Sequence, residues 1–165
     1  MFAHFLGRSS EILDERGGTH VIQTLPKNVT FTQGAKALAC IRLTENGLLR
    51  WYSSCCKTPI GNTLANFKIS FVGLVHNCLE TPDSSLESTL GPVRARVNTK
   101  SARGTPKPDS AGVLAWLLPF AVMLAKARLN GSYKQTPFLD QDRGSSIVTP
   151  RVLDRREWED LRKAL

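Results

Sequence analysis

The residues best suited to chemistry in this sequence are its four cysteines, Cys40, Cys55, Cys56 and Cys78. Cys55 and Cys56 are adjacent, within the stretch RWYSSCCKTPIGN at residues 50–62. A cysteine thiolate is both a strong nucleophile and a preferred ligand of zinc, so the pair suggests either chemistry. The two are not expected to form a disulfide with each other, because neighbouring Cα atoms lie about 3.8 Å apart and disulfides usually need roughly 4.4–6.8 Å.

The spacing of the cysteines does not by itself predict a zinc site. Zinc knuckles usually place two cysteines as C-x₂-C, a pattern this chain lacks. Ser53 stands three residues before Cys56, but a serine is a poor substitute for a thiolate at zinc. In a regular strand Cys55 and Cys56 would point to opposite faces, unless the turn at 57–59 begins early. From spacing alone we interpret the cysteines as buried free thiols.

A cysteine nucleophile would need a nearby base and a lowered pKa. Arg50 and Lys57 are close to the cysteine pair in sequence, but no histidine has a spacing that predicts a partner for Cys55 or Cys56. The three histidines of the chain are His4, His20 and His76. A lone histidine is more often structural or exposed than catalytic, so we do not predict a catalytic cysteine.

The net charge of +8 is concentrated in one segment. Residues 91–134 contain eight basic residues and one acidic residue and carry +7, whereas residues 1–90 carry +1 and residues 135–165 carry no net charge. A basic segment binds phosphates without sequence preference, but this one lacks interleaved aromatic residues and a nucleic-acid-binding motif. We predict a solvated connector and no specific nucleic-acid partner.

Short antiparallel strands are predicted between Thr19 and Asn77. Five segments rich in β-branched and aromatic residues indicate them: 19–25, 28–34, 36–43, 48–54 and 67–76. Turn residues separate these segments, and Asn46-Gly47 is typical of a hairpin between the third and the fourth. We interpret Gly61-Asn62 as a further turn, so the segments are expected to form a meander.

The remaining chain predicts a connector and two helices. Residues 79–111 are rich in Pro, Ser, Gly and charge, which indicates an exposed, partly disordered connector. Residues 112–129 predict a helix, in which Pro119 indicates a kink or a late start. This helix is apolar all round, which favours burial over the sheet or contact with a protein partner over a membrane interface. Asp154, with Glu157 three residues later, predicts a capping box for a final helix.

The 165-residue chain has the length of one domain. No stretch reaches the roughly 18 apolar residues of a membrane span. The first residues also lack the basic and apolar regions of a signal peptide. We therefore expect a cytoplasmic protein without a transmembrane segment, a setting in which structural disulfides are rare.

Most of the chain resembles an uncharacterised bacterial family related to the glutathione-dependent formaldehyde-activating enzymes and to centromere protein V. The matching stretches are FAHFLG (2–7), ILDERGGTHVIQTLP (12–26), VTFTQG (29–34), LACIRL (38–43), GLLRWYSSCCKTPIGNT (47–63), FVGLVH (71–76) and the tail at 131–158. The resemblance implies a mainly β, Mss4-like antiparallel fold with a C-terminal α-helical extension. Its parts would be a β domain at 1–78, a basic flexible connector at 79–111 and a helical extension at 112–165.

The resemblance also implies a metal site. In the formaldehyde-activating relatives, an N-terminal C-x-C joins a later C-x-x-C-G-T around a structural zinc, and a middle C-x-C-x-x-C holds the zinc linked to carbon–sulfur lyase chemistry. Cys56 aligns with the second cysteine of the later motif, Ser53 takes the place of the first, and Cys55 would be a substitute ligand. The predicted metal ligands are therefore Cys55 and Cys56, with zinc bound only if upstream cysteine ligands are present and no cofactor otherwise.

Met1 stands where the middle cysteine cluster ends in those relatives, so the β domain is expected to be incomplete at its N-terminus. A start assigned too far downstream and a truncated paralogue both remain open explanations. The resemblance implies zinc-dependent action on a small thiol adduct, such as a glutathione conjugate, for full-length relatives and an inactive lyase for this chain. The competing hypothesis is a non-enzymatic interaction module that binds a protein partner through helix 112–129 and the basic connector.

Overall fold

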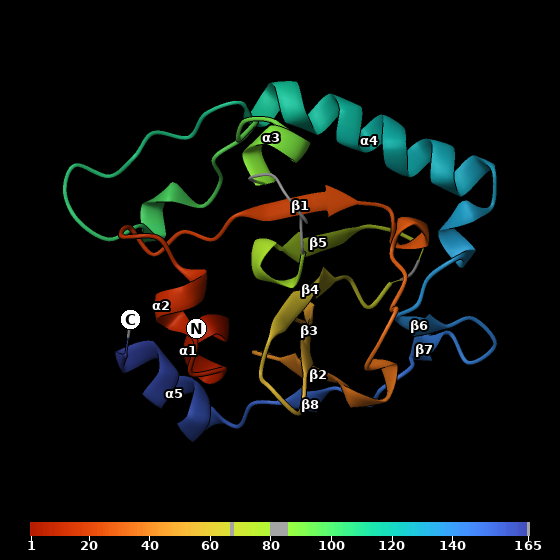
Figure 1. Ribbon diagram of the computed structural model, residues 1–165, viewed down its shortest axis with the longest axis horizontal. Coiled ribbons are helices and arrows are strands. Elements are labelled where there is room, and N and C mark those ends of the chain that lie inside the picture. Colours follow the sequence, from red (N-terminus) through yellow and green to blue (C-terminus); the bar gives the residue numbers. More distant parts are fainter. Residues whose placement is uncertain (67, 80–85, 165) are drawn as a thin grey trace.

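A six-stranded sheet forms the centre of the computed structural model, which describes residues 1–66, 68–79 and 86–164 (Figure 1). Along the sheet the strands lie in the order β1 (Val21–Thr24), β5 (Val72–Val75), β4 (Pro59–Thr63), β3 (Leu49–Ser53), β2 (Leu38–Arg42) and β8 (Arg151–Val152). β8 pairs parallel to β2, and the other neighbouring strands are antiparallel. A second, two-stranded sheet joins β6 (Leu139–Asp140) to β7 (Ser145–Ser146).

The sequence pattern predicted four of the six strands in this sheet. β1, β2, β3 and β5 lie inside four of the five predicted segments, although residue 67, where the last segment begins, is outside the described residues. The predicted hairpin joins β2 to β3, and its turn is closed by a hydrogen bond of 2.9 Å from Gly47 N to Thr44 O. Strands β2 to β5 form a meander that differs from the expected one, because it contains β4 and lacks a strand at 28–34, and β1 adds to it beside β5.

The prediction of a strand at 28–34 is wrong. A 3₁₀ turn at Pro26–Asn28 and a left-handed Gly34, with φ 67°, interrupt the extended backbone on either side. Val29 and Phe31 instead pack against the core from outside the sheet. The apolar residues of this segment therefore cover one face of the sheet rather than extend it.

The interpretation of Gly61-Asn62 as a turn is also wrong, because both residues lie within β4. A Cβ at Gly61 would come within 2.6 Å of the carbonyl oxygen of Gly73 on β5. Glycine at this position therefore permits the close approach of the two strands. The proline at the start of β4, Pro59, occupies a position that strands tolerate.

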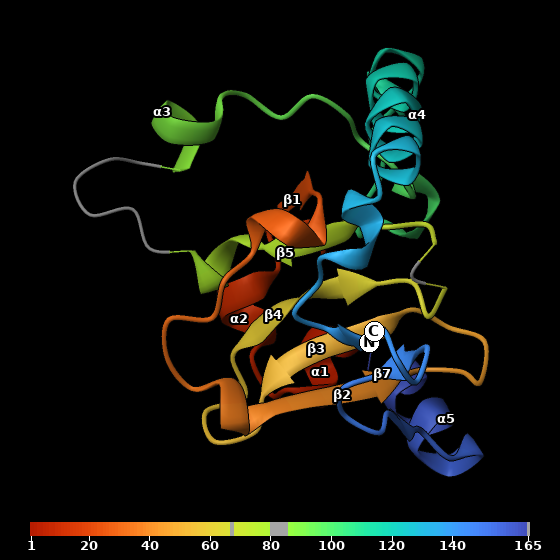
Figure 2. The same cartoon turned by 90° about the vertical axis from the view of Figure 1, so that its right-hand side faces the viewer.

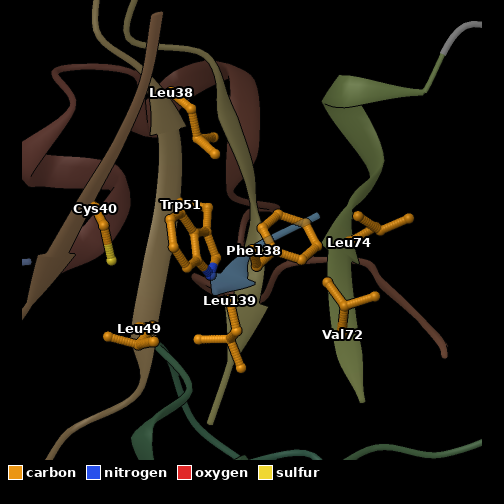
Figure 3. Close-up of a cluster of buried hydrophobic side chains, with 8 residues drawn as sticks. All are labelled: Leu38, Cys40, Leu49, Trp51, Val72, Leu74, Phe138 and Leu139. Atoms are coloured by element: carbon orange, nitrogen blue, oxygen red, sulfur yellow. The ribbon is translucent and has the colours of Figure 1, made fainter. Parts of the chain in front are cut away.

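Two hydrophobic clusters cover the two faces of the sheet, since consecutive strand residues such as Trp51 and Tyr52 belong to different clusters. Trp51 is fully buried in the first cluster, and its Nε1 donates to Thr63 Oγ1 at 2.9 Å. Its ring lies beside that of Phe138 (Figure 3), with the two centroids 5.1 Å apart. The first cluster comprises Leu38, Cys40, Leu49, Trp51, Val72, Leu74, Phe138 and Leu139. The second comprises Ala3, Leu6, Ile12, Ile41, Tyr52, Val75 and Leu153. The C-terminal part of the chain thus contributes to the core as well as to the sheet.

The helices lie around this sheet. They are α1 (Phe2–Phe5), α2 (Ser9–Ile12), α3 (Leu86–Leu90), α4 (Val113–Leu129) and α5 (Arg155–Lys163), and short 3₁₀ helices occur at Pro26–Asn28, Ala35–Ala37, His76–Cys78, Thr99–Ser101 and Ser132–Lys134. The predicted capping box opens α5: Asp154 accepts a hydrogen bond from Glu157 N at 2.8 Å, and Asp154 N donates to Glu157 Oε2 at 3.1 Å. The fold is therefore a six-stranded mixed sheet with helices around it, one of them at the C-terminal end.

The predicted helix at 112–129 is confirmed as α4, which begins at Val113, well before Pro119, so a late start does not occur. It lies at the periphery, beyond the β1 side of the sheet (Figures 1 and 2). Of the two expectations for this helix, burial over the sheet is wrong for most of its surface, because Ala127 is its one buried residue, and contact with a protein partner stays a prediction. None of the helices in the described part of the chain has both the length and the apolar character needed to cross a membrane.

The predicted connector at 79–111 is described only in part, because residues 80–85 lie outside the described residues. From residue 88 onwards its side chains are mostly exposed, as expected. It contains α3 and a single bridge, in which Arg96 pairs with Ala111.

Candidate functional site: the thiol turn

Cys55 and Cys56 lie in the tight turn between β3 and β4, which we call the thiol turn (residues 53–58). Ser53 N donates to Thr58 O at 2.9 Å, and Lys57 N donates to Ser53 O at 2.9 Å, so two backbone hydrogen bonds close it. Lys57 has a positive φ of 58°. The turn thus begins before the predicted position at 57–59, and neither cysteine belongs to a strand.

Both cysteines of the thiol turn are exposed, so the prediction of buried thiols is wrong for this pair. The physical reason is that the turn projects past the end of β3, where its backbone groups are satisfied locally and the hydrophobic clusters do not reach. The prediction holds for Cys40, which is buried, and Cys78 is half-buried. All four cysteines are free.

Two hydroxyl groups flank the exposed thiols. Ser53 Oγ lies 3.1 Å from Cys55 Sγ, and Thr58 Oγ1 lies 3.1 Å from Cys56 Sγ. Hydrogen bonds from Ser53, and then from the side chain and backbone of Thr58, stabilise the charged form and lower the pKa of Cys56 to about 6. Cys56 is therefore largely a thiolate at neutral pH, and an exposed thiolate is available for nucleophilic attack.

The other two thiols have the opposite environment. Burial raises the pKa of Cys40 to about 12 and that of Cys78 to about 11. The thiol of Cys78 also donates a hydrogen bond to the carbonyl oxygen of Ile60 at 3.2 Å. These two cysteines are neutral at physiological pH and serve packing.

The thiol turn is attached to the rest of the fold at two places. Ser54 N donates to Ala37 O at 2.7 Å, which ties the turn to the segment before β2. Lys57 Nζ lies 5.3 Å from the centroid of the Tyr52 ring, and Tyr52 belongs to the second hydrophobic cluster. These contacts hold the backbone that carries the two thiols against the folded domain.

The predicted zinc ligands are adjacent and exposed, but they do not make a zinc site together. A structural zinc takes four protein ligands and a catalytic zinc about three. Within residues 1–66, 68–79 and 86–164, no group of three or more His, Cys, Asp or Glu side chains is arranged to hold a metal ion. Cys55 and Cys56 thus offer at most two thiolates, and zinc binding would need ligands from elsewhere.

Sequence reasoning did not identify Ser53 and Thr58 as partners of the thiols. It considered histidine as the partner of a reactive cysteine, whereas the hydrogen-bond partners found for Cys55 and Cys56 in the described residues are hydroxyl and backbone groups. The available signal was a hydroxyl residue two positions from each cysteine, Ser53 before Cys55 and Thr58 after Cys56. A hydroxyl at that spacing reaches the cysteine sulfur only when the backbone turns between the two residues.

Comparison with known proteins places the chain in a family. Neither the curated proteins nor the solved structures include a significant match, so the resemblance to Mss4-like proteins stays a prediction. Residues 1–147, which include the sheet strands β1 to β5 and the thiol turn, match a family of unknown function (DUF6151). Because this match covers well over half of the sequence, the chain belongs to that family.

Proposed function

We propose that the thiol turn is a reactive site at which Cys56 forms a reversible mixed disulfide by reaction with the disulfide form of a small thiol compound such as glutathione. The observation that carries the proposal is the placement of Cys55 and Cys56 on an exposed turn, with the hydroxyls of Ser53 and Thr58 each 3.1 Å from a thiol sulfur. Such an arrangement favours a thiolate that solvent and small solutes reach freely.

The proposed reaction is thiol–disulfide exchange. The thiolate of Cys56 attacks one sulfur of glutathione disulfide, a new sulfur–sulfur bond forms, and the old one breaks. The second glutathione leaves as a thiolate with the electron pair of the broken bond, so glutathione disulfide itself is the oxidant. A further glutathione thiolate reverses the step by attacking the mixed disulfide at Cys56.

Cys55 does not complete a dithiol cycle in this proposal. A disulfide between adjacent residues would have to close at a Cα separation of about 3.8 Å, below the usual range of roughly 4.4–6.8 Å. The mixed disulfide at Cys56 therefore persists until an external thiol removes it. Ser53, hydrogen-bonded to Cys55, and Thr58, beside Cys56, act as positioning residues.

The resemblance to formaldehyde-activating enzymes supports the same substrate class, since those relatives act on a glutathione adduct. We extend the proposal to an Mss4-like architecture and a cytoplasmic location, where glutathione is abundant and thiols stay reduced. We assign no zinc-dependent lyase step to this chain, because two thiols do not supply the ligands that such a step requires.

The proposal is tested by incubating the folded protein with glutathione disulfide and measuring the intact mass and the modified peptide. We expect one glutathionyl group per chain, on Cys56, that dithiothreitol removes. Cys56→Ser should abolish the adduct, while Cys55→Ser, the matched control one residue away, should retain it. Equal modification of wild type and Cys56→Ser would disprove the assignment, as would preferential modification of buried Cys40.

A further inference from the structure

One side of α4 packs on the domain. Trp116 Nε1 donates to Gln23 Oε1 on β1 at 2.7 Å, and the Trp116 ring stacks on Phe120 with a centroid separation of 5.1 Å. Phe120 in turn meets Phe71 edge-on at 5.5 Å, and Ala127 is buried in the last turns. These contacts fix which side of the helix faces the sheet.

The opposite side of α4 carries a stripe of exposed apolar residues. Leu114, Leu118 and Leu129 are 83%, 70% and 88% exposed, and Val122 is 44% exposed. The first three members, Leu114, Leu118 and Val122, are spaced four residues apart, so they lie along one face. Ala125 and Leu129 continue that face. Large contiguous apolar surfaces of this kind mark interaction sites.

Positive charge flanks the stripe at both ends. Lys126 and Arg128 lie in the last turn of α4 and are exposed. At the first turn, Gly112 fits so closely against the backbone of Arg94 that a Cβ would come within 1.9 Å of the Arg94 carbonyl oxygen. Arg96 N also donates to Ala111 O at 2.8 Å. The basic connector is thus fastened to the start of the helix.

Within residues 91–134, this charge has little compensation from acidic residues. α4 contains no acidic residue, and Asp109 is the one acid among residues 91–134. The ion pairs found within the described residues involve other cations, and none includes Arg94, Arg96, Lys126 or Arg128. The surface around α4 therefore combines exposed leucines with cations that have no carboxylate partner in that part of the chain.

We propose that α4 docks this protein onto the surface of an anionic lipid bilayer. The leucine stripe would enter the boundary between headgroups and acyl chains, while Lys126 and Arg128 reach the lipid phosphates and carboxylates with their charged ends. Basic residues beside such a helix add electrostatic attraction to anionic lipids. The domain itself covers the other apolar side of α4, and so takes the place of the polar face that free interfacial helices carry.

A second copy of the chain fits this surface less well. Two copies packed through α4 would bring their basic connectors and the cations at the helix ends together, and like charges repel across an apolar interface. An anionic bilayer supplies both the hydrocarbon and the opposite charge. Charge complementarity therefore favours an anionic lipid surface over a second copy of the chain as the partner of this face of α4.

The test is flotation of the full chain with two sets of vesicles, one of phosphatidylcholine alone and one of an equal mixture of phosphatidylcholine and phosphatidylserine. We expect the protein to float with the mixed vesicles and to stay largely unbound with phosphatidylcholine. The double variant L114S/L118S should weaken binding to mixed vesicles by about tenfold or more. Lys126→Gln should weaken binding to the mixed vesicles by roughly fivefold, and added salt should also weaken this binding.

Matched controls keep the result interpretable. Ile147 is 49% exposed and follows β7 rather than belonging to α4, so Ile147→Ser should leave binding unchanged, and Lys36→Gln is the charge control. Circular dichroism verifies that each variant is folded, which we expect because the replaced leucines are exposed. Failure of the wild type to float with mixed vesicles overturns the proposal. A dimer in analytical ultracentrifugation that L114S/L118S dissolves also overturns it, since a second copy would then cover the stripe.

Discussion

Cys40 lies in the middle of β2 and Cys56 in the turn between β3 and β4, and their thiols have opposite properties. Cys40 is buried beside Trp51 on the first face of the sheet, and burial raises its pKa to about 12. Cys56 lies past the end of β3, where the thiol turn lowers its pKa to about 6. The contrast arises from burial at Cys40 and from hydrogen bonds of Ser53 and Thr58 at Cys56.

This comparison teaches that position relative to the end of a strand decides what a cysteine can do here. Inside β2, the pleat directs Cys40 into a hydrophobic cluster where only a neutral thiol is stable. Beyond β3, the turning backbone brings Ser53 and Thr58 to the thiols and leaves them open to solvent. The packing thiol and the reactive thiol are therefore separable by mutation and by reagent.

The largest expected effect is a difference in alkylation rate. At pH 7 Cys56 is mostly thiolate, whereas the thiolate fraction of Cys40 is about 10⁻⁵. The weaker intrinsic nucleophilicity of a low-pKa thiolate offsets roughly half of this on a logarithmic scale, so we expect Cys56 to react at least 10²–10³ times faster. Timed iodoacetamide labelling with peptide mass spectrometry measures both rates. Comparable rates in the native protein would contradict the assignment of the two environments.

The pH dependence of Cys56 should reflect the hydroxyl groups of the turn. Because its folded pKa is lowered to about 6, its reactivity should rise between about pH 5 and 7 and then level off. Replacing Ser53 by Ala, or Thr58 by Val, removes a donor to the thiolate and should raise the midpoint by roughly one pH unit. Thiolate ultraviolet absorbance across the pH range measures that midpoint. Lys36→Gln, outside the turn, serves as the control, and an unchanged midpoint in both turn variants would contradict the role of the hydroxyls.

Stability should respond to the buried cysteine and not to the exposed one. Cys40→Ser places a hydroxyl in the apolar cluster and should lower the free energy of unfolding by about 1–3 kcal/mol. Cys55→Ser makes the same replacement on the surface and should change it by less than about 0.5 kcal/mol. Urea unfolding followed by tryptophan fluorescence, which reports the buried Trp51, compares the two. A larger loss for Cys55→Ser would mean that the thiol turn is a structural element.

The smallest expected effect is that of metal removal. The described residues offer the pair Cys55 and Cys56 without a third ligand, and the core consists of side chains such as Trp51 and Phe138. We therefore expect elemental analysis to find well under one zinc per chain, and a chelator to leave the unfolding midpoint unchanged. Stoichiometric zinc whose removal unfolds the protein would restore the zinc interpretation of the cysteine pair.

The sequence predicted the elements with strong local signals. The β-branched and aromatic residues of β2, β3 and β5, the Asn46-Gly47 hairpin and the Asp154 capping box are each local signals. β4 was missed because its Gly61 is explained only by the approach of Gly73, which is distant in sequence. The residues around Phe31 indicate a strand, and the contact of Phe31 with Phe138 that places this segment outside the sheet is not visible in the local sequence.

The residues of the candidate site were predictable from the sequence, but the exposure and the pKa of its cysteines were not. The adjacent cysteines drew attention from the start, but their exposure depends on where β3 ends, and strand ends are the least reliable part of a pattern. Helix α4 shows the same limit: its composition fixed the helix, while the surface left open depends on which residues meet β1 and Phe71.

The parallel pairing of β8 with β2 has a consequence for biosynthesis. Ile41 and Arg42 acquire their partners, Arg151 and Val152, only after more than a hundred intervening residues have been made. A nascent chain that has left the ribosome with its meander assembled therefore presents the open edge of β2 to other nascent chains until that late segment emerges. Any shortening of the polypeptide ahead of Arg151 would make this transient exposure permanent, and edge-to-edge aggregation would be the expected fate of the product.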